Sequence, residues 1–235
     1  MSRGLGDVYK RQVFLLSLLR AVTSFSLIIA YQNIASGVAS TIHFMYPLAV
    51  ALAMMFFFRE KKSLLVILAV LMSLLGAALL SLGELEAKSG NTMVGLVAAC
   101  VSVFSYAGYI VGVRTTRAVQ INSTALTCYV MGLGTIFYLI GAYCTSGLQL
   151  VSDGYTWLII LGLALPATAI SNITLVQAIK YAGPTLTSIL GAMEPLTAVV
   201  IGVFVFKELF TVNSAVGIIL ILLAVSIVVF RRQKS

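Results

Sequence analysis

The chain has 235 residues, of which 60% are hydrophobic and only 9% are charged, and its mean hydropathy is +1.08. Soluble domains carry about 25% charged residues, so this composition excludes a soluble globular protein. The net charge of +8 does not indicate nucleic-acid binding, because the basic residues lie between apolar stretches rather than on one soluble face.

Apolar runs of about 20 residues predict eight membrane-spanning helices joined by short connections. In chain order they cover residues 13–31, 36–58, 63–82, 92–112, 123–144, 155–178, 184–206 and 212–230. We therefore expect an all-α polytopic membrane protein of about eight transmembrane helices. Residues 1–12, ahead of the first helix, are polar, lack the apolar core of a signal peptide and resemble a translated adaptor. We interpret them as a non-native leader.

The basic residues predict how the helices are oriented. Over alternate connections, twelve of the fifteen Lys and Arg residues fall on the side of the N-terminus, and only Lys88 and Lys207 fall on the other. Loops rich in Lys and Arg stay in the cytoplasm. Both termini are therefore expected in the cytoplasm, with the protein in the cell (inner) membrane.

The chain contains an internal repeat with an offset of 148 residues. The repeat aligns Met45-Tyr46-Pro47 with Met193-Glu194-Pro195. It extends over further pairs: Leu27 with Leu175, Ala30 with Ala178, Ser40 with Ser188, Phe56 with Phe204 and Glu60 with Glu208. Because the matched helices are five apart, an odd number, the second copy is expected to be inverted in the membrane. Two inverted halves are typical of small-molecule transporters.

Glu194 is the only acidic residue inside a predicted span, and it lies near the middle of that span. A charged side chain at the bilayer centre costs about 2.5–3.5 kcal/mol, so we expect it to face the interior of the bundle. Two interpretations stay open. Glu194 either binds a proton or a substrate cation, or it is a protonated acid that hydrogen-bonds a neighbouring helix.

Pro47 and Pro195 occupy matching mid-helix positions and predict a kink in each half. A proline inside a helix removes one backbone hydrogen bond, which is expected to free the carbonyls of His43 and Gly191. Transporters commonly place binding sites at such interruptions. A plain packing kink is the alternative.

His43 and Tyr46 are three residues apart and share a helix face, and Tyr46 stands at the position equivalent to Glu194. Both could hydrogen-bond a substrate or relay a proton. Arg20 either extends its charge to the cytoplasmic interface or lines a polar cavity. Four more residues are candidates for the cavity wall: Tyr106, Tyr109, Asn172 and Gln177.

The sequence offers little support for a metal site, a cofactor or an enzyme. The three cysteines (Cys100, Cys128 and Cys144) lie in predicted spans, and no Cys or His spacing is typical of a metal site, so we expect neither a metal nor a cofactor. Ser40 and His43 lie one turn apart, but no protease motif surrounds them, so we expect no enzyme. An intramembrane enzyme is kept as an alternative.

The sequence resembles the EamA-type transporters of the drug/metabolite transporter (DMT) superfamily. The second half carries the pattern Ala178, Gly183, Thr187, Glu194-Pro195, Lys207-Glu208 and Gly217, and the first half carries Ala30, Ser40, Pro47, Arg59-Glu60 and Gly76. The resemblance covers nearly all of Val13 to Phe230, and its most specific element is the spacing of thirteen residues from proline to glutamate in both halves. That family has ten helices in two inverted repeats around a central cavity and moves amino acids, other metabolites or drugs.

The resemblance implies a domain organisation. Residues 13–82 would be the remaining three helices of a first EamA repeat, residues 83–91 a linker, and residues 92–235 a second repeat of five helices with a basic cytoplasmic tail. The first two helices of the family fold would be absent from this chain.

The function implied by the resemblance is secondary-active transport. We expect an exporter of small metabolites, amino acids or drugs that works by alternating access in the lipid bilayer, with the proton as the candidate coupling ion. The alternative is an inactive fragment or a non-transporting membrane subunit. The sequence leaves the oligomeric state open and predicts no nucleic-acid partner.

Overall fold

The computed structural model describes residues 2–34, 36–59, 64–81, 90–144, 151, 153–191, 193–204 and 212–233. Helices dominate these residues, and no strand occurs among them, which confirms the all-α prediction. Glu60, Lys207-Glu208 and most of the expected linker lie outside the described residues.

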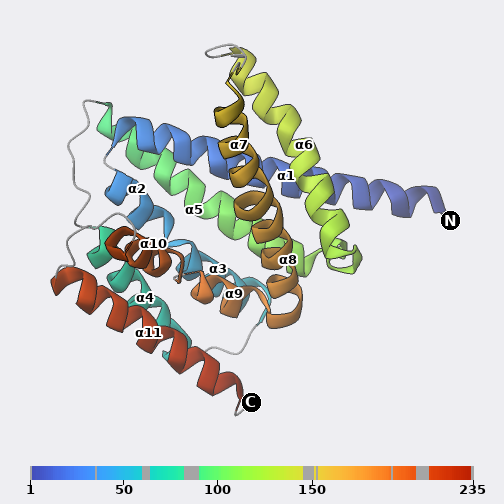
Figure 1. The fold of residues 1–235 in the computed structure, drawn as a ribbon. Helices are drawn as coiled ribbons and strands as arrows, with labels where there is room; N and C mark the ends of the chain where they lie inside the picture. Colours follow the sequence, from blue (N-terminus) through green and yellow to red (C-terminus); the bar gives the residue numbers. More distant parts are fainter. Residues whose placement is uncertain are drawn as a thin grey trace. The chain divides into compact units, whose positions relative to one another are not determined.

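Every predicted span has a helical counterpart (Figure 1). The α-helices are α1 (Ser2–Asn33), α2 (Ser36–His43), α3 (Tyr46–Phe57), α4 (Leu64–Ser81), α5 (Thr92–Thr115), α6 (Ser123–Cys144), α7 (Gly154–Gly162), α8 (Ser171–Ala182), α9 (Pro184–Leu190), α10 (Met193–Phe204) and α11 (Val212–Gln233). A 3-10 turn, η2 (Arg117–Gln120), precedes α6, and a π-helical segment, η3 (Leu163–Ile170), joins α7 to α8. Three predicted spans are therefore composite: α2 with α3, α7 with η3 and α8, and α9 with α10.

Length and composition identify five stretches of the described chain that could cross a membrane. They are Tyr9–Asn33, Val38–Phe57, Thr92–Thr115, Ser123–Tyr143 and Gly154–Ala182. Each is a helix, or a run of helical segments, of at least 18 residues with high hydropathy. This finding supports the polytopic membrane fold.

Two features differ from the expected helices. The first helix begins at Ser2 rather than near residue 13, so it runs through the segment interpreted as a leader. The sixth span contains Pro166, and its helix is not the regular one that the apolar run alone predicts. Proline lacks an N–H group, and the helix widens around it, so that the Ser171 N–H reaches back five residues to the Pro166 carbonyl.

Contacts divide the chain into two compact units. Unit 1 contains Met1–Ala21 and Gly112–Gly183, and unit 2 contains Val22–Val111 and Pro184–Ser235. The chain of α1 and that of α5 each pass from one unit into the other. The expected site residues are divided between these two units.

Unit 1 is held by contacts of α1 and α8 with α6 and with the turn before it. The Ser17 hydroxyl donates to the Val130 carbonyl at 2.8 Å, and the rings of Phe14 and Phe137 meet edge to face with centroids 5.7 Å apart. The Lys180 ammonium donates to the carbonyl of Ile121. These contacts attach both helices to the segment around α6.

Local signals fix the ends of α7 and α8. The Asp153 carboxylate accepts 2.9 Å hydrogen bonds from the N–H and the hydroxyl of Thr156, which caps α7. The Trp157 indole N–H donates to the Val151 carbonyl at 3.0 Å. Gly183 ends α8 with a φ of 89°, and Pro184 starts α9, as the Gly-Pro sequence predicts.

Unit 2 is built on the close packing of α4 against α11, which run side by side in Figure 1. A Cβ atom at Gly76 would lie 2.7 Å from both the Gly217 carbonyl oxygen and the Ile221 Cγ1. Only glycine permits this approach. Small residues at such interfaces let membrane helices come close enough to gain van der Waals contact. A buried apolar cluster lies beside it: Ala51, Met55, Ala69, Val70, Ile189 and Ala224.

Candidate functional site

Two helices of unit 2 are interrupted at matching places. α3 begins three residues after α2 ends, and α10 begins three residues after α9 ends. Pro47 is the second residue of α3, and Pro195 is the third residue of α10. In the first turn of a helix an N–H group has no intrahelical partner, so proline is tolerated there. Each break thus turns one long span into two half-helices.

Short-range backbone hydrogen bonds close both breaks. The Gly191 carbonyl accepts from the Glu194 N–H at 3.0 Å, and the Ile42 carbonyl accepts from the Met45 N–H at 2.9 Å. The expectation that the proline frees the Gly191 carbonyl is therefore wrong. The reason is that a bond to the third residue along, of the 3-10 type, replaces the lost helical bond.

The two breaks meet through the side chain of Tyr46. Tyr46 is only 3% exposed. A Cβ atom at Gly191 would lie 1.8 Å from the Tyr46 hydroxyl oxygen and 3.1 Å from Cζ, so the phenol occupies the space that any side chain at Gly191 would need. The packing of α3 against α9 therefore depends on a glycine in one copy of the repeat and a tyrosine in the other.

Tyr46 belongs to a cluster of four aromatic side chains. Its ring centroid lies 4.7 Å from that of Tyr106 in an edge-to-face arrangement and 5.5 Å from that of His43. The His43 and Tyr106 centroids are 5.4 Å apart, and Tyr109 stacks on Tyr106 at 6.4 Å. These are the ordinary separations of interacting aromatic pairs. The structure thus brings together His43, Tyr46 and Tyr106, three of the six expected site residues, and adds the cavity-wall candidate Tyr109.

Helix α5 presents two serine hydroxyls on the side of this cluster. The Ser102 Oγ lies 3.0 Å from the His43 Nδ1 and 2.6 Å from the Ala99 carbonyl oxygen. The Ser105 Oγ lies 2.9 Å from the Thr23 Oγ1. Ser102 is not among the site residues expected from the sequence. The signal was available, because Ser102, Ser105, Tyr106 and Tyr109 repeat at helical spacing along one face of an apolar span.

His43 does not use its Nδ1 for the enzyme-like pair considered from the sequence. That nitrogen bonds Ser102, whereas the Ser40 hydroxyl lies 3.2 Å from the Tyr31 hydroxyl. Ser40 and His43 are therefore hydrogen-bonded to different residues in this structure.

Glu194 stands in the first turn of α10, and its side chain is exposed. Its carboxylate lies within electrostatic range of the buried Tyr46 hydroxyl. The start of a helix carries a partial positive charge, which favours an ionised carboxylate there. Both interpretations of Glu194 made from the sequence stay predictions.

Arg20 and Asn172 form a separate polar pair in unit 1. The Arg20 Nη2 donates to the Asn172 Oδ1 at 3.3 Å, and the Asn172 Nδ2 donates to the Thr168 carbonyl at 2.7 Å. Asn172 is buried, at 5% exposure. The hydrogen bond from Arg20 therefore ends on a buried side chain of the same unit. The expected site residues therefore fall into two groups, one in each unit.

The comparison with known families bears on what these groups do. The EamA-like transporter family matches residues 93–230, which is more than half of the chain. The chain belongs to this family. The EamA resemblance and the prediction of a transmembrane transporter are thereby confirmed. No curated protein matches the chain in sequence.

The fold agrees with that of a protein of known structure. One crystal structure matches with a TM-score of 0.80 at 18% identity, over 97% of this chain and 79% of the other. At this identity the likeness concerns the fold alone. The family match places this EamA-like transporter among integral membrane proteins.

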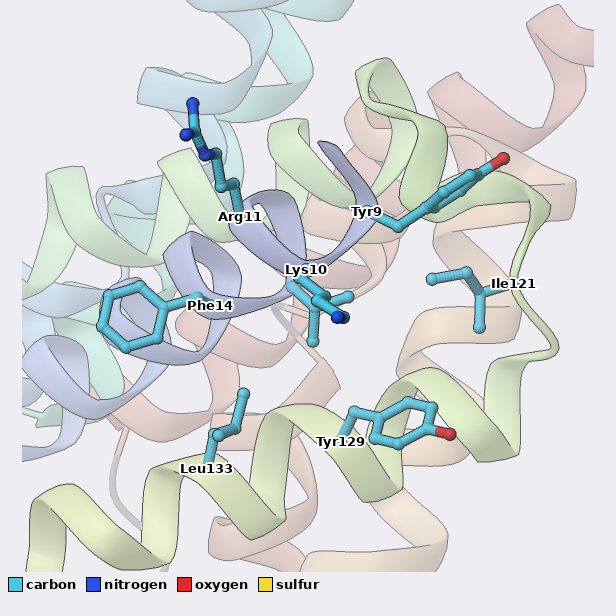
Figure 2. A pocket seen from close by; sticks show the side chains of 8 residues that line it. Tyr9, Lys10, Arg11, Phe14, Ile121, Tyr129 and Leu133 are labelled. Atoms are coloured by element: carbon cyan, nitrogen blue, oxygen red, sulfur yellow. The ribbon is translucent and has the colours of Figure 1, made fainter. Parts of the chain in front are cut away.

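Unit 1 of this EamA-like transporter contains a cavity of about 660 Å³. Figure 2 shows side chains from α1 and α6 facing one another across it, with Tyr9 and Tyr129 on opposite sides. Its lining consists of Tyr9, Lys10, Arg11, Val13, Phe14, Ile121, Tyr129 and Leu133. Three of these residues belong to the segment interpreted as a non-native leader, so we assign the cavity no function.

A smaller cavity of about 400 Å³ lies by the turn before α6 and the end of α8. It is lined by polar groups, including Gln177 and Lys180, and contains none of the six expected site residues. Gln177, a candidate for the cavity wall, belongs to unit 1, whereas the aromatic cluster belongs to unit 2. Among the described residues, no three His, Cys, Asp or Glu side chains lie where they could share a metal ion.

Proposed function

We propose that this EamA-like transporter is a secondary-active exporter of small metabolites, amino acids or drugs. It works by alternating access, with a substrate site at the two helix breaks. The observation that carries the proposal is the seating of Tyr46 against Gly191, because it joins the two breaks within one packed unit. Interrupted helices are tolerated at membrane depth where the backbone is buried in protein or lines a cavity, and transporters build their sites there.

The proposed site residues have different roles. Tyr46, which is buried, sets the spacing of the two breaks. His43 and Tyr106 are half-buried, so they can offer both ring faces and polar atoms to a ligand. Glu194 is exposed and supplies the negative charge. Arg20 and Asn172 are proposed as substrate or coupling contacts of unit 1.

The proton is the proposed coupling ion, with Glu194 as the group that binds it. A carboxylate at membrane depth is costly to keep ionised, so a substrate cation and a proton would compete for it. The proposal includes the topology expected from the basic residues, with both termini in the cytoplasm and the protein in the inner membrane. It also keeps residues 13–82 and 92–235 as the two repeats.

Transport by the purified chain in proteoliposomes tests the proposal. A panel of amino acids, cationic drugs and sugars is assayed with an imposed pH gradient, and we expect flux of at least one class. The Glu194→Gln variant should stay folded in the membrane and lose the flux that depends on the gradient. Asp153→Asn is the matched control, because it also replaces a carboxylate by an amide, at a position distant from Glu194 in the sequence. Asparagine can still cap α7.

Two results would contradict the proposal at different levels. Unchanged flux in Glu194→Gln would remove Glu194 from the mechanism and leave transport standing. Absence of flux across the whole panel, with the protein correctly inserted, would count against transport by this chain.

A further inference from the structure

The polar cavity of about 400 Å³ in unit 1 lies outside the proposed substrate site. Its wall is made by the turn before α6, the first residues of α6 and the end of α8. None of the described residues that line it is acidic, and one of them, Lys180, is a cation. The charge of this wall is therefore positive, which suits an anionic ligand.

Lys180 is fixed at the wall and has hydrogens left to donate. Its ammonium donates to the Ile121 carbonyl, and its own carbonyl accepts a 2.7 Å hydrogen bond from the Arg114 guanidinium. An ammonium has three N–H donors. The Ile121 carbonyl is its one acceptor among the described residues, so two of the three hydrogens can reach a ligand.

Three neutral side chains add donors to the cavity. Ser123 and Thr124 carry hydroxyls at the start of α6, and Gln177 carries an amide on α8. Within the described part of the chain, none of these three side chains has a hydrogen-bond partner. The Thr124 N–H, by contrast, is already used, because the Asn122 Oδ1 accepts from it at 2.9 Å. The capacity to bind a ligand thus lies in the side chains and not in the backbone at the start of α6.

The cavity lies where anionic lipid headgroups are expected. The connections after α5 and after α8 both fall on the side of the N-terminus, which the basic residues predict to be cytoplasmic. The cytoplasmic leaflet carries anionic phospholipids, and basic pockets between helices on that side bind their headgroups. A phosphate has several acceptor oxygens, so it can use donors from α6 and α8 at once.

We infer that this cavity binds an anionic phosphate group, with Lys180 as its ion-pair partner and with Ser123, Thr124 and Gln177 as hydrogen-bond donors. One lysine balances the single charge of the phosphodiester in a phospholipid headgroup. Soluble inorganic phosphate offers the same oxygens, so the experiment separates the two sources. The inference does not rest on the substrate site at the helix breaks.

Thermal unfolding of the full chain in neutral detergent micelles tests the inference, because a ligand that binds only the folded protein raises Tm. The protein is titrated with phosphatidylglycerol, with phosphatidylcholine, or with inorganic phosphate against chloride at equal ionic strength. We expect phosphatidylglycerol to raise Tm more than phosphatidylcholine, whose choline offsets the charge of the phosphate. A rise with phosphatidylglycerol alone identifies a lipid headgroup as the source, and an equal rise with inorganic phosphate identifies soluble phosphate. No rise with either would overturn the inference.

A pair of charge-removing variants separates the cavity from a general effect of net charge. Lys180→Gln should raise the ligand concentration that gives half of the Tm increase by about tenfold or more, because it removes a hydrogen bond between charged groups. Arg117→Gln is the matched control, because Arg117 is an exposed cation of η2 that does not line the cavity. It should leave that concentration unchanged. No change in Lys180→Gln, or an equal change in Arg117→Gln, would overturn the assignment to the cavity.

A neutral variant decides the matter if Lys180→Gln does not fold. Gln177 is exposed and makes no hydrogen bond through its side chain to another described residue, so Gln177→Ala should leave Tm without ligand unchanged. It should raise the half-effect concentration by about twofold to tenfold, the factor that one hydrogen bond supplies. With Lys180→Gln unfolded, an unchanged concentration in Gln177→Ala would overturn the inference. Because no transport is measured, each of these results leaves the proposed function standing.

Discussion

The break between α2 and α3 and the break between α9 and α10 share one backbone plan and differ in the side chains they carry. Each interrupts its helix over the same interval and places a proline in the first turn that follows. The repeat offset pairs His43 with Gly191 and Tyr46 with Glu194. Tyr46 is buried and Glu194 is exposed. The two copies of the repeat therefore share the interruption, whereas the side chains at the two breaks differ in chemistry.

The divergence is also a condition for packing. Tyr46 of one copy fills the space beside Gly191 of the other. A chain with identical copies would carry histidine at position 191, and its Cβ would fall 1.8 Å from the Tyr46 hydroxyl oxygen. The large residue in one break therefore requires the small residue in the other. Asymmetry at the breaks is what allows α3 and α9 to pack closely.

The largest expected difference between the two breaks is the effect of truncating their equivalent side chains, Tyr46 and Glu194. Tyr46→Ala should lower the free energy of unfolding by about 3–5 kcal/mol, as for other large buried aromatic residues. Glu194→Ala should change it by less than about 0.5 kcal/mol, because an exposed side chain makes few packing contacts. Unfolding of the two variants in the same detergent, followed by circular dichroism, measures the difference. Similar losses in both would show that the two positions are not distinguished by burial.

A substitution at the contact between the breaks should have the next largest effect. Gly191→Ala forces the Tyr46 phenol to move and should lower the free energy of unfolding by about 1–3 kcal/mol, the usual range for overpacking. Adding Tyr46→Phe removes the clashing oxygen and should restore part of the loss. A double-mutant cycle with no coupling between the two substitutions would disprove the contact.

Gly132 provides the matched control for that cycle. It lies within α6, and a Cβ atom there would meet nothing within 4 Å. Gly132→Ala should therefore be neutral or stabilising by up to about 1 kcal/mol, the gain in helix propensity. A destabilisation equal to that of Gly191→Ala would show that the effect belongs to glycine replacement in general.

Replacing the proline of the first break should produce a smaller change. Pro47 stands where its missing N–H has no helical partner, so alanine gains no backbone hydrogen bond there. Pro47→Ala should lower the free energy of unfolding by about 0.4–1 kcal/mol, because the unfolded chain becomes more flexible. Thermal unfolding of the variant beside the wild type measures this. A gain in stability would mean that the proline strains the break.

The smallest effect concerns a helix that starts outside a break. The N–H and hydroxyl of Thr156 hold the pKa of the Asp153 carboxyl below its usual range, whereas α3 starts without a side-chain cap. A lowered folded-state pKa means stability that is present above the ordinary aspartate pKa and is lost as the pH falls through the lowered value. Asp153→Ala should thus destabilise slightly near neutral pH and should have no effect in strong acid. Unfolding curves at both pH values check the sign, and an equal effect at both would contradict it.

Much of the fold follows from the sequence because membrane helices are long and apolar. The limits of α6 agree with the predicted span, and the Gly183-Pro184 turn lies where glycine and proline demand it. The matching breaks follow from the repeat and its two prolines. Helical spacing predicts that His43 and Tyr46 share one face, whereas Tyr106, on another helix, is expected from the sequence only as a residue of the cavity wall.

The remaining features depend on contacts that no local pattern specifies. Ser102 is a common residue in an apolar helix, and only the position of His43 on another helix gives it a role. Pro166 widens its helix instead of breaking it, because the Ser171 N–H finds the Pro166 carbonyl as an acceptor. Arg20 and Asn172 belong to unit 1 and the aromatic cluster belongs to unit 2, a division that depends on how the helices pack. These are tertiary effects, which sequence spacing cannot supply.

The cap of α7 carries one further consequence through its neighbour Trp157. The chain has one tryptophan, in unit 1, and one histidine, in unit 2. The Trp157 indole is 52% exposed and donates to the Val151 carbonyl, so its fluorescence emission reports on the local order at the start of α7. The nitrogen resonances of His43 report on the aromatic cluster. Two natural probes can therefore follow the two units independently in one unmodified protein.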